Sequence, residues 1–555
     1  MPLPEASATS PPIVVKGHPA PWHDVPALLR AKARQHGARI FCEIDGRKLA
    51  YDELDALCDR VGAHLAALGV APGDRVGSLM FNCAEQVFGW IGSNRIGAIW
   101  APFNAGLTGD DLAYTLRDSG ARILLVDSEN APKIAALPVE LRADLRVFVA
   151  APHGQEAGCE SLRGFNSFDE LLAAPVPPLP VMPLGPGMAA MILYSGGTTG
   201  LPKGVVLPHF AFVCVGFRYG EVLGVSAADH HYTTLPLFHA SGIQLGIIGP
   251  LLNDLSVTMD RRFSASGYWR RVRECGATVI DPIGTMMTTL VQQPAGRADR
   301  DHRVRVSTGV NGQIPAAVPA EFARRFGVRI IDIYGLTECG AAMATSNIAQ
   351  VPGSVGHPNG WSEIAILDDN DNRLPAGEVG TIVLRPTVPF SFMLGYHNNP
   401  AKTAETWRNL WVHSGDRGRL DAGGNLFFVG REAHWIRRRG ENISAHEIES
   451  ILSAHPAVCE CIVIGVPSPL GEEDVKAWII AAAPRPEAED LADWCIARMA
   501  AFKVPRYFEF TDSFPRSIAK QEVERPKLKE RGNQHAWDRE QQRGRLSAQG
   551  GAAAR

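Results

Sequence analysis

The chain has 555 residues, of which 45% are hydrophobic and 21% are charged. This profile is that of a folded globular protein of two to four domains, and it excludes a disordered or fibrous chain. The 55 basic and 59 acidic residues give a net charge of −4, so the surface as a whole offers no bulk attraction to nucleic acid or to an anionic membrane.

The N-terminal part predicts an α/β arrangement. Residues 1 to about 20 are rich in proline, serine and alanine, and we expect a flexible arm. Apolar residues recur at spacings of three and four between Leu54 and Leu68, and Gly69 follows, which predicts an amphipathic helix with a defined C-terminus. Apolar runs at 75–80 and 123–127 predict strands. Residues 174–187 contain six prolines and two glycines, which indicates a linker or a crossing loop.

A glycine- and threonine-rich stretch follows, from Tyr194 to Gly204, after an apolar run at 188–193 that predicts a buried strand. Its glycines allow the backbone to turn tightly and to bring N–H groups close to an anion, and its hydroxyls and Lys203 add donors. This composition favours a phosphate-binding loop, with a flexible surface loop as the open alternative. The stretch is not a Walker A motif, because no Gly-Lys-Ser/Thr closes it and Val205–Leu207 predicts a strand where that motif requires a helix.

The second half continues the α/β pattern and then changes. Runs at 277–280 and 328–333 predict strands that end at polar or glycine residues, where ligands collect in open α/β sheets. Short strands at 381–384 and 425–429 around Gly/Asp turns predict a β-rich segment. After Gly430 and Arg431 a compact αβ segment runs to about residue 530, with helices near 445–454 and 490–501 and strands at 458–464 and 475–481. The stretch from 531 to 555 predicts a disordered tail.

The cysteines and the N-terminus indicate a cytoplasmic protein. The ten cysteines have no regular spacing, so they do not form a disulfide framework. Cys459 and Cys461 are close together, and their spacing in a predicted strand places both on one face. No basic segment precedes an apolar one near the N-terminus, and no window approaches ~18 uninterrupted apolar residues, so we expect no signal peptide and no membrane span.

Four further motifs carry chemistry. The run Tyr334-Gly335-Leu336-Thr337-Glu338 follows a predicted strand and supplies a hydroxyl and a carboxylate suited to phosphate and its Mg²⁺. Trp411–Asp416 ends in an aspartate on a turn, a group that accepts hydrogen bonds from two ribose hydroxyls. Gly430-Arg431 marks the domain boundary, and Arg437–Ile443 begins the small domain. Each has an ordinary alternative in isolation: a strand-to-turn junction, an Asx-turn or a surface charge.

These motifs, in this order, resemble those of the adenylate-forming superfamily, which includes acyl-CoA synthetases, adenylation domains of peptide synthetases and firefly-type luciferases. The resemblance covers about residues 25–530. Within the superfamily, three segments look most like the crotonobetaine/carnitine-type acyl-CoA ligases: LPLFHA (235–240), RFSASGYWRRVRECGATV (262–279) and RRRGENISAHEIE (437–449).

The resemblance implies an AMP-forming ligase that works in two steps. A carboxylate attacks the α-phosphorus of MgATP to give an acyl-adenylate and pyrophosphate, and the thiol of coenzyme A then displaces AMP. The implied cofactors are ATP, Mg²⁺ and coenzyme A, and the implied partners are a carboxylic acid, ATP and CoA, with no nucleic acid and with a homodimer left open. The fold class is α/β: a flexible arm (1–20), a large adenylating domain of α/β sheets with a β-rich subdomain (21–430), a small mobile α+β domain (431–530) and a disordered tail (531–555).

The resemblance also assigns roles to residues, position by position. Thr337 would contact the α-phosphate, and His239 would line or gate the acyl pocket. Mg²⁺ would bind to Glu338 and Thr198. The ribose would bind to Asp416 and Arg431, and the adenine would lie against Gly309, Asn311 and Gly312. The other expected nucleotide contacts are Tyr334 and, around the phosphates, Ser195, Gly196, Gly197, Thr198, Thr199, Gly200 and Lys203.

Three positions depart from the family pattern. The phosphate loop begins Ser195-Gly196-Gly197 where the family has Thr-Ser-Gly, so one hydroxyl is missing. The hinge position is Ala433 in place of Asp or Lys, and rotation needs free backbone angles more than a charge. The family also has a C-terminal lysine that bridges the acyl carboxylate and the α-phosphate. Counting forward from Pro515 places Gln521 there, and counting back from Val523 places Glu522 there, so Lys520 lies one or two places early. We expect its long side chain to reach the site.

Two alternatives to a CoA ligase stay open. One is an adenylating enzyme that loads a carrier-protein thiol; amino-acid-activating relatives hold an aspartate near LPLFHA, and Phe238–Ser241 has none. The other is a nucleotide- or acyl-binding homologue that has lost catalysis, as the displaced Lys520 would allow. The residues expected around the acyl chain are mostly apolar, which favours a non-amino acyl or aryl acid of limited bulk: Phe217, His239, Ile243, Ile283 and Val310.

Overall fold

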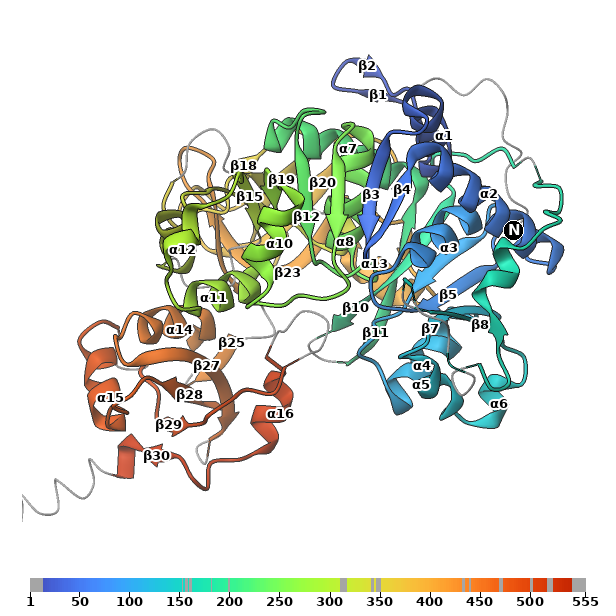
Figure 1. Cartoon of the computed structure of the whole chain (residues 1–555). Coiled ribbons are helices and arrows are strands. Elements are labelled where there is room, and N and C mark those ends of the chain that lie inside the picture. The colour runs from blue at the N-terminus through green and yellow to red at the C-terminus, as the bar shows by residue number, and fades with distance from the viewer. Residues whose placement is uncertain are drawn as a thin grey trace, which may run out of the picture.

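The structure, a computed structural model, describes residues 13–151, 153–154, 158, 162–180, 182–197, 200–309, 317–340, 344–345, 351–431, 435–438, 441–468, 473–499, 503–516 and 523–541. Figure 1 shows a large part, formed by the residues up to about 431, and a smaller part, orange to red, formed by those that follow. Among the helices that these ranges contain, none is long and apolar enough to cross a membrane.

The first large sheet has eight strands: β5 (Arg75–Leu79), β6 (Ile99–Pro102), β7 (Ile123–Asp127), β8 (Arg146–Ala150), β9 (Asn166–Ser167), β10 (Ala189–Gly197), β11 (Gly200–Pro208) and β21 (Gly395–Tyr396). Their order is β21-β11-β10-β6-β5-β7-β8-β9. The strands from β10 to β9 pair in parallel, whereas β11 pairs antiparallel with both β10 and β21. The β10–β11 hairpin therefore lies near one edge of the sheet, with only β21 outside it.

The second large sheet has nine strands: β3 (Ile40–Ile44), β4 (Arg47–Ala50), β12 (His230–Thr233), β13 (Ser256–Met259), β14 (Val279–Ile280), β15 (Val306–Gly309), β16 (Arg329–Tyr334), β17 (Ala344–Thr345) and β18 (His357–Pro358). Their order is β18-β17-β16-β15-β14-β12-β13-β3-β4, and the strands from β16 to β3 pair in parallel. Their carboxyl ends lie at one edge of the sheet, which is where ligands bind in open parallel sheets.

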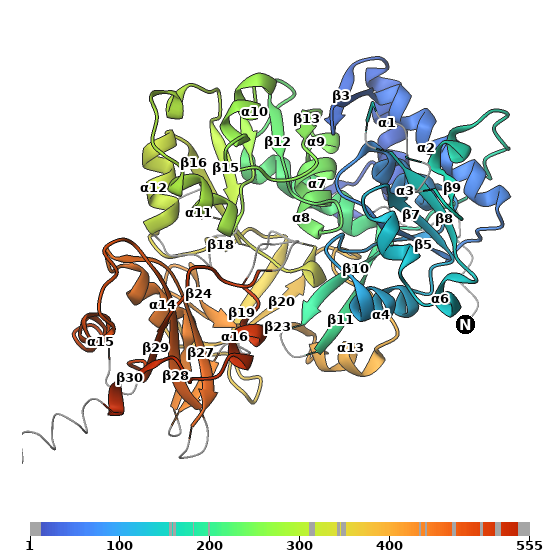
Figure 2. The same ribbon diagram turned by 60° about the horizontal axis from the view of Figure 1, so that its bottom comes forward.

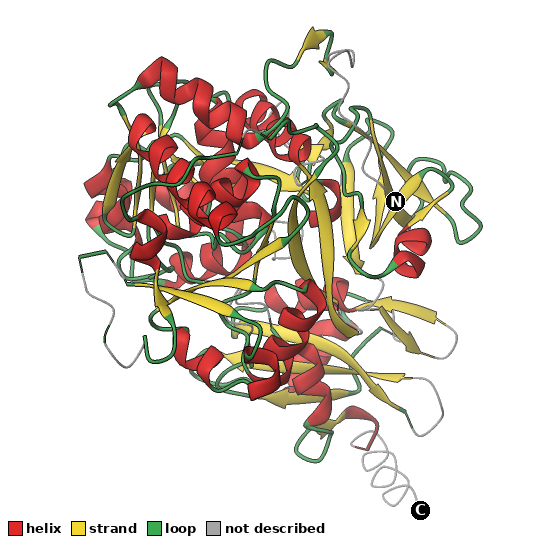
Figure 3. Cartoon of the chain, turned by 90° about the vertical axis from the view of Figure 1, so that its right-hand side faces the viewer, coloured by secondary structure: helices red, strands yellow, loops and turns green. Residues whose placement is uncertain are grey.

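Helices cover both faces of these sheets. In the first sheet, Leu125 packs in the same cluster as Trp90, whereas its neighbour Leu124 packs with Leu116 on the opposite face, as strand alternation requires. Figure 3 shows the resulting layers of strands flanked by helices. The helices and turns of the large part are α1 (Val25–His36), α2 (Tyr51–Ala67), α3 (Ala84–Arg95), α4 (Gly109–Ser119), α5 (Ala131–Ala135), α6 (Val139–Arg142), η1 (Phe168–Leu172), α7 (His209–Leu223), α8 (Ala240–Ile243), the π-helix η2 (Gln244–Ile248), α9 (Gly249–Leu252), α10 (Tyr268–Cys275), α11 (Gly284–Gln292), η3 (Arg297–Arg300), α12 (Ala317–Phe326), η4 (Thr337–Cys339) and α13 (Pro400–Thr406).

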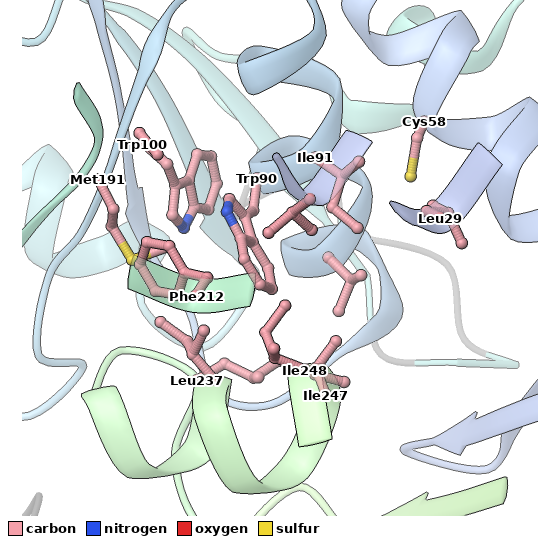
Figure 4. Close-up of a cluster of buried hydrophobic side chains, with 14 of the residues drawn as sticks. Leu29, Cys58, Trp90, Ile91, Trp100, Met191, Phe212, Leu237, Ile247 and Ile248 are labelled. Atoms are coloured by element: carbon pink, nitrogen blue, oxygen red, sulfur yellow. The ribbon is translucent and has the colours of Figure 1, made fainter. Parts of the chain in front are cut away.

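A buried hydrophobic cluster joins the two sheets (Figure 4). The ring centroids of Trp90, from α3, and Phe212, from α7, lie 6.0 Å apart. In Figure 4 the side chains of Leu237, from the turn before α8, and Ile247, from η2, lie near this pair. Burial of each such side chain contributes about 1.5–3 kcal/mol. The cluster therefore fixes the segment around Leu237, which contains the predicted acyl-site motif, against the first sheet.

A third, antiparallel sheet confirms the predicted β-rich segment. Its strands are β19 (Ser362–Leu367), β20 (Gly380–Pro386), β22 (Trp407–Arg408), β23 (Trp411–Leu420) and β24 (Leu426–Arg431), in the order β19-β20-β23-β22 with β24 also paired to β23. Its core includes Tyr334 and Val412, so this sheet packs against the end of β16. Because β24 is its last strand, the chain leaves this sheet directly into the smaller part.

The smaller part has a hydrophobic core of its own, which includes Ile448, Val463, Leu491 and Phe508. A four-stranded sheet in the order β27-β28-β29-β30 (Figure 2) and a separate hairpin, β25–β26, form its framework. Its elements are β25 (Trp435–Arg438), β26 (Glu441–Ser444), α14 (Ala445–Ser453), β27 (Val458–Pro467), β28 (Glu473–Ala481), α15 (Ala488–Ile496), β29 (Tyr507–Phe510), α16 (Arg525–Glu530) and β30 (Trp537–Asp538).

A buried ion-pair network links the ends of this smaller part. Arg438 and Asp474 are each only 2% exposed, and Arg438 Nε lies 3.1 Å from Asp474 Oδ1. Arg506 Nη1 lies 2.9 Å from Asp474 Oδ2, and Arg506 Nη2 lies 3.0 Å from Asp538 Oδ2. Glu540 is a further partner of both arginines. Because Asp538 belongs to β30, the network ties the last described strand to β25 and β28.

Three expectations from the sequence do not hold for the described residues. Within the predicted flexible arm, β1 (Val14–Val15) and β2 (His18–Pro19) form a hairpin, and Ile13 and Val15 are buried in the main core. Within the predicted disordered tail, Trp537–Asp538 pairs with β29. Cys459 is exposed and Cys461 is buried, because a register shift between Val458 and Glu460 interrupts the alternation along β27.

His209 predicts a pH-dependent stability. It is 1% exposed, neither ring nitrogen has a hydrogen-bond partner among the described residues, and burial lowers its pKa from 6.5 to about 3. Between these values the unfolded chain binds the proton and the folded chain does not, so stability is full above pH 6.5 and falls as the pH falls. At pH 5 the free energy of unfolding should be about 2 kcal/mol lower through this group. Urea titrations of wild type and His209→Phe should show a flatter profile for the variant between pH 7 and 5, and equal slopes would contradict this.

Candidate active site

The described residues of the glycine- and threonine-rich stretch form the facing ends of two antiparallel strands, β10 and β11. In the antiparallel pair β10–β11, Ser195 lies opposite Lys203 and Gly197 lies opposite Gly200. The predicted strand at Val205–Leu207 is confirmed, and β10 extends four residues further than predicted, through Gly197. Gly196 is part of β10. Thr198 and Thr199, which we predicted to bind phosphate and Mg²⁺, lie outside the described residues.

Side chains on both strands hold this β10–β11 hairpin, the predicted phosphate hairpin, in place. The hydroxyl of Tyr194 donates to Asp118 Oδ2 over 2.8 Å at the end of α4, and burial, followed by this hydrogen bond, raises the pKa of Tyr194. The hydroxyl of Ser195 lies 3.5 Å from the carbonyl oxygen of Lys203 across the hairpin. Lys203 Nζ lies 5.9 Å from the centroid of the Tyr396 ring. The hairpin therefore carries the hydroxyl of Ser195 and the ammonium group of Lys203 at positions that face each other across the strand pair.

The second predicted motif forms a tight turn beside the hairpin. Tyr334 ends β16, and Thr337–Cys339 forms the 3₁₀ turn η4, which Gly340 closes with a φ of +62°. The η4 turn contacts β11. Glu338 Oε1 accepts a hydrogen bond of 2.8 Å from the hydroxyl of Tyr396. The buried guanidinium of Arg218 donates to the carbonyl oxygen of Gly340, so α7 also supports this turn.

Tyr334 and Asp416 meet on the third side of the site. The hydroxyl of Tyr334 donates to Asp416 Oδ2 over 2.8 Å, and both residues are buried. Burial, followed by the charge of Asp416, raises the pKa of Tyr334, so the phenol remains a donor. The N–H of Asp416 donates to Ser414 Oγ over 3.0 Å. Tyr334 therefore orients the carboxylate of Asp416, which is the predicted ribose-binding group.

The remaining predicted nucleotide residues lie on adjacent elements. Arg431 is the register partner of Asp416 in the β23–β24 pair. Gly309 ends β15 and lies opposite Asp332 of β16, two residues before Tyr334. Asn311 and Gly312 lie outside the described residues.

His239 begins the helix α8 at the predicted acyl site. It is the N-cap residue, its N–H donates to the carbonyl oxygen of Pro236 over 3.0 Å, and its ring centroid lies 4.9 Å from that of Phe238. Of the other residues expected there, Ile243 is buried, Phe217 and Ile283 are partly buried, and Val310 lies outside the described residues.

Asn82 is a supporting residue that sequence reasoning missed. It is 1% exposed, its side-chain oxygen accepts from the N–H of Leu237 over 2.8 Å, and its side-chain nitrogen donates to the carbonyl oxygen of Leu235 over 3.0 Å. These bonds fix the backbone on both sides of Pro236. No local signal marks Asn82, because it lies 155 residues before Leu237.

Lys520 lies outside the described residues, between two segments that are paired. Arg516 and Val523 form an antiparallel bridge, and the N–H of Glu524 donates to the carbonyl oxygen of Pro515 over 2.8 Å. Arg516 pairs with Glu460 on β27. Both ends of the connection that carries Lys520 are therefore held next to each other.

The carboxylate of Glu338 is a suitable ligand for a Mg²⁺ ion that binds together with a nucleotide. A carboxylate is a hard oxygen ligand, and its two oxygens accept more bonds than the one donated by Tyr396. In the described ranges no group of three or more His, Cys, Asp or Glu side chains could hold a metal ion. A single carboxylate suits Mg²⁺, which commonly binds through one or two carboxylates together with substrate phosphates.

Sequence comparison extends this picture to most of the chain. Residues 29–397 match a family described as AMP-binding enzyme, and residues 447–520 match the AMP-binding enzyme C-terminal domain. The chain is similar to the crotonobetaine/carnitine–CoA ligase of Salmonella heidelberg (strain SL476), with 31% identity over 514 residues that cover 90% of this chain and 96% of the relative.

Two solved structures are similar to the whole arrangement. The anthranilate CoA ligase AuaEII in complex with anthranoyl-AMP has a TM-score of 0.81 and 28% sequence identity, with 92% of this chain and 97% of that chain covered. The O-succinylbenzoate coenzyme A synthetase of Bacillus subtilis in complex with ATP and a magnesium ion has a TM-score of 0.76 and 26% identity, with 90% of this chain and 99% of that chain covered.

Proposed function

The chain belongs to the family of AMP-binding enzymes, and we propose that it joins a small non-amino acyl or aryl acid to coenzyme A. It is an AMP-forming acid–thiol ligase, which uses ATP to activate the acid and CoA to accept it. The observation that carries the proposal for its site is the meeting of the phosphate hairpin with the turn that holds Glu338, joined through Tyr396. A phosphate-binding segment and a metal-binding carboxylate must be adjacent if both act on one nucleotide.

The first step forms the acyl-adenylate. One carboxylate oxygen of the acid bonds to the α-phosphorus of ATP, and the bond to the β-phosphate oxygen breaks, which releases pyrophosphate. Negative charge builds on the phosphate oxygens, so fixed donors and cations directed there lower the barrier most. In our proposal the hairpin and Lys203 bind the phosphates, Thr337 contacts the α-phosphate, and Lys520 bridges the two reacting groups. Glu338 would hold Mg²⁺, which neutralises part of the phosphate charge when it is bound.

The second step forms the thioester. The sulfur of CoA bonds to the acyl carbon, the bond from that carbon to the phosphate oxygen breaks, and AMP leaves. We propose that the domain from 431 to 530 rotates between the steps, with its hinge near Ala433. The separate core of the smaller part supports such a movement, because rotation then leaves its interior packing intact.

The acyl site supports a neutral acyl or aryl chain. Its described residues Phe217, Ile243 and Ile283 are apolar, and such a lining suits a hydrocarbon or aromatic group of limited bulk. A quaternary ammonium acid would require an aromatic cage or a carboxylate, and these residues supply neither. His239 would line or gate this pocket.

Pyrophosphate exchange tests the function. Purified protein with MgATP and labelled pyrophosphate should incorporate label into ATP with at least one acid from a panel of short acyl, branched acyl and aryl acids. Added CoA should then give a thioester and AMP in equal amounts. No exchange across the panel would contradict the activity, and exchange without a CoA thioester would favour a carrier-protein acceptor.

The variant Asp416→Ala gives the most direct single test of where the nucleotide binds. Asp416→Ala removes a charged acceptor for two ribose hydroxyls, and hydrogen bonds to a charged group contribute about 1.5–3 kcal/mol, so the KM for ATP should rise roughly 10- to 100-fold. Asp421→Ala, in the turn between β23 and β24, is a matched control and should leave this KM unchanged. An unchanged KM in Asp416→Ala would contradict the assignment.

Two finer points concern the location of the protein and its oligomeric state. We propose a cytoplasmic location, which the nine free cysteines of the described residues support, because free thiols persist in reducing compartments. A homodimer stays a prediction, and light scattering of the purified protein would test it.

A further inference from the structure

The segment Met393–His397 connects the two halves of the phosphate site. At its start, the N–H of Met393 donates to the carbonyl oxygen of Glu338 over 2.8 Å. At its end, the N–H of His397 donates to the carbonyl oxygen of Gly204 over 2.7 Å, as part of the antiparallel pairing of β21 with β11. The segment therefore ties the η4 turn to the phosphate hairpin through its backbone.

Tyr396 repeats this connection with its side chain. Its hydroxyl donates to Glu338 Oε1 over 2.8 Å, and its ring centroid lies 5.9 Å from Lys203 Nζ, within the range of a cation–π contact. One partly buried side chain thus contacts the predicted metal ligand and the predicted phosphate ligand at once.

We propose that Tyr396 is a positioning residue for the metal–nucleotide complex. A donor on one carboxylate oxygen fixes the rotation of the carboxylate, so that the other oxygen of Glu338 keeps one direction toward a bound cation. The same ring limits where the Lys203 ammonium can lie. This inference rests on the proposed function, because Glu338 and Lys203 share a ligand only in the reaction with MgATP.

The experiment separates the hydroxyl from the ring. Tyr396→Phe removes the bond to Glu338 and keeps the ring near Lys203, whereas Tyr396→Leu removes both contacts. Tyr232→Phe is the matched control, because its hydroxyl donates to Asp260 Oδ2 over 3.0 Å elsewhere in the fold. Mn²⁺ is titrated into each protein with ATP and without acid, and free Mn²⁺ is followed by electron paramagnetic resonance.

Loss of an outer partner of a metal ligand typically weakens metal binding 10- to 100-fold, so the Mn²⁺ dissociation constant of Tyr396→Phe should rise about tenfold or more. Its kcat for pyrophosphate exchange at saturating Mg²⁺ should stay within a few-fold of wild type. Tyr396→Leu should in addition weaken ATP binding at saturating metal, and Tyr232→Phe should match wild type in both measurements.

Two results would overturn the inference. One is a wild-type Mn²⁺ affinity in Tyr396→Phe. The other is an unchanged Mn²⁺ affinity in Glu338→Gln, which would remove the metal from this carboxylate. In either case, pyrophosphate exchange by the wild-type protein would still establish the proposed reaction, so the two failures are distinguishable.

Discussion

Replacement of Lys520 by alanine should slow acid-dependent pyrophosphate exchange by roughly 10²–10³-fold, because a cation directed at the charge that develops in the transition state is lost. The second half-reaction should change little, since the bridge between carboxylate and α-phosphate is needed only while the adenylate forms. Synthetic acyl-adenylate and CoA supplied to the variant should therefore give thioester at a rate within a few-fold of wild type.

Two further variants make this expectation specific. Lys527→Ala removes a nearby lysine on α16 that pairs with Glu524 on the surface, and it should exchange pyrophosphate as wild type does. Figures 1 and 2 both show α16, which begins five residues after Lys520, on the flank of the smaller part nearest to β11. Unchanged exchange in Lys520→Ala would show that this lysine is not the bridge. In that case Gln521→Lys, which restores a lysine at one of the two family positions, should raise the rate of pyrophosphate exchange.

Replacement of Asp474 by alanine should destabilise the smaller part by about 3–5 kcal/mol, because it removes the buried carboxylate that lies nearest to the buried guanidinium of Arg438 and leaves Glu540, at 3.5 Å, as the remaining acidic partner. Arg506 loses one of its carboxylate partners in the same variant. The loss should appear as a separate, earlier unfolding transition in urea, and tryptophan emission from Trp478, which lies on β28, should report it.

Lys529→Ala is the matched control for this experiment. Lys529 is 50% exposed and pairs with Glu473, the neighbour of Asp474, over 3.2 Å. An exposed pair of this kind contributes about 0–1 kcal/mol, so the control should unfold close to wild type. Equal midpoints for Asp474→Ala and wild type would mean that the network adds nothing to stability.

Local patterns in the sequence predicted the elements that carry the site. The strand at Ile123–Asp127 agrees with its prediction in full, and the helix predicted around Leu54–Leu68 spans Tyr51–Ala67. The motifs at Ser195 and Glu338 could be found because the residues of each motif follow one another within a short stretch of sequence. The family followed from the order of the motifs along the chain, and the α/β fold followed from the alternation of predicted strands and helices.

Features that depend on distant contacts could not be predicted in this way. Tyr396 lies 58 residues after Glu338, and a tyrosine at that distance carries no signal of its hydrogen bond. The unequal burial of Cys459 and Cys461 comes from a register shift, which depends on the pairing of β27 with β28. Such features depend on tertiary pairing, which residue spacing does not encode.

The sheet of the smaller part includes the strand β30, so a fragment that contains the complete sheet must extend through Asp538. The match to the C-terminal domain of the family ends at residue 520, yet Trp537–Asp538 pairs with β29 at the outer side of the sheet. A fragment cut at the end of that match would leave the backbone groups of Tyr507 and Phe508 as an open edge. Unpaired edges of this kind recruit strands from other molecules, so the short strand β30 protects the sheet from self-association.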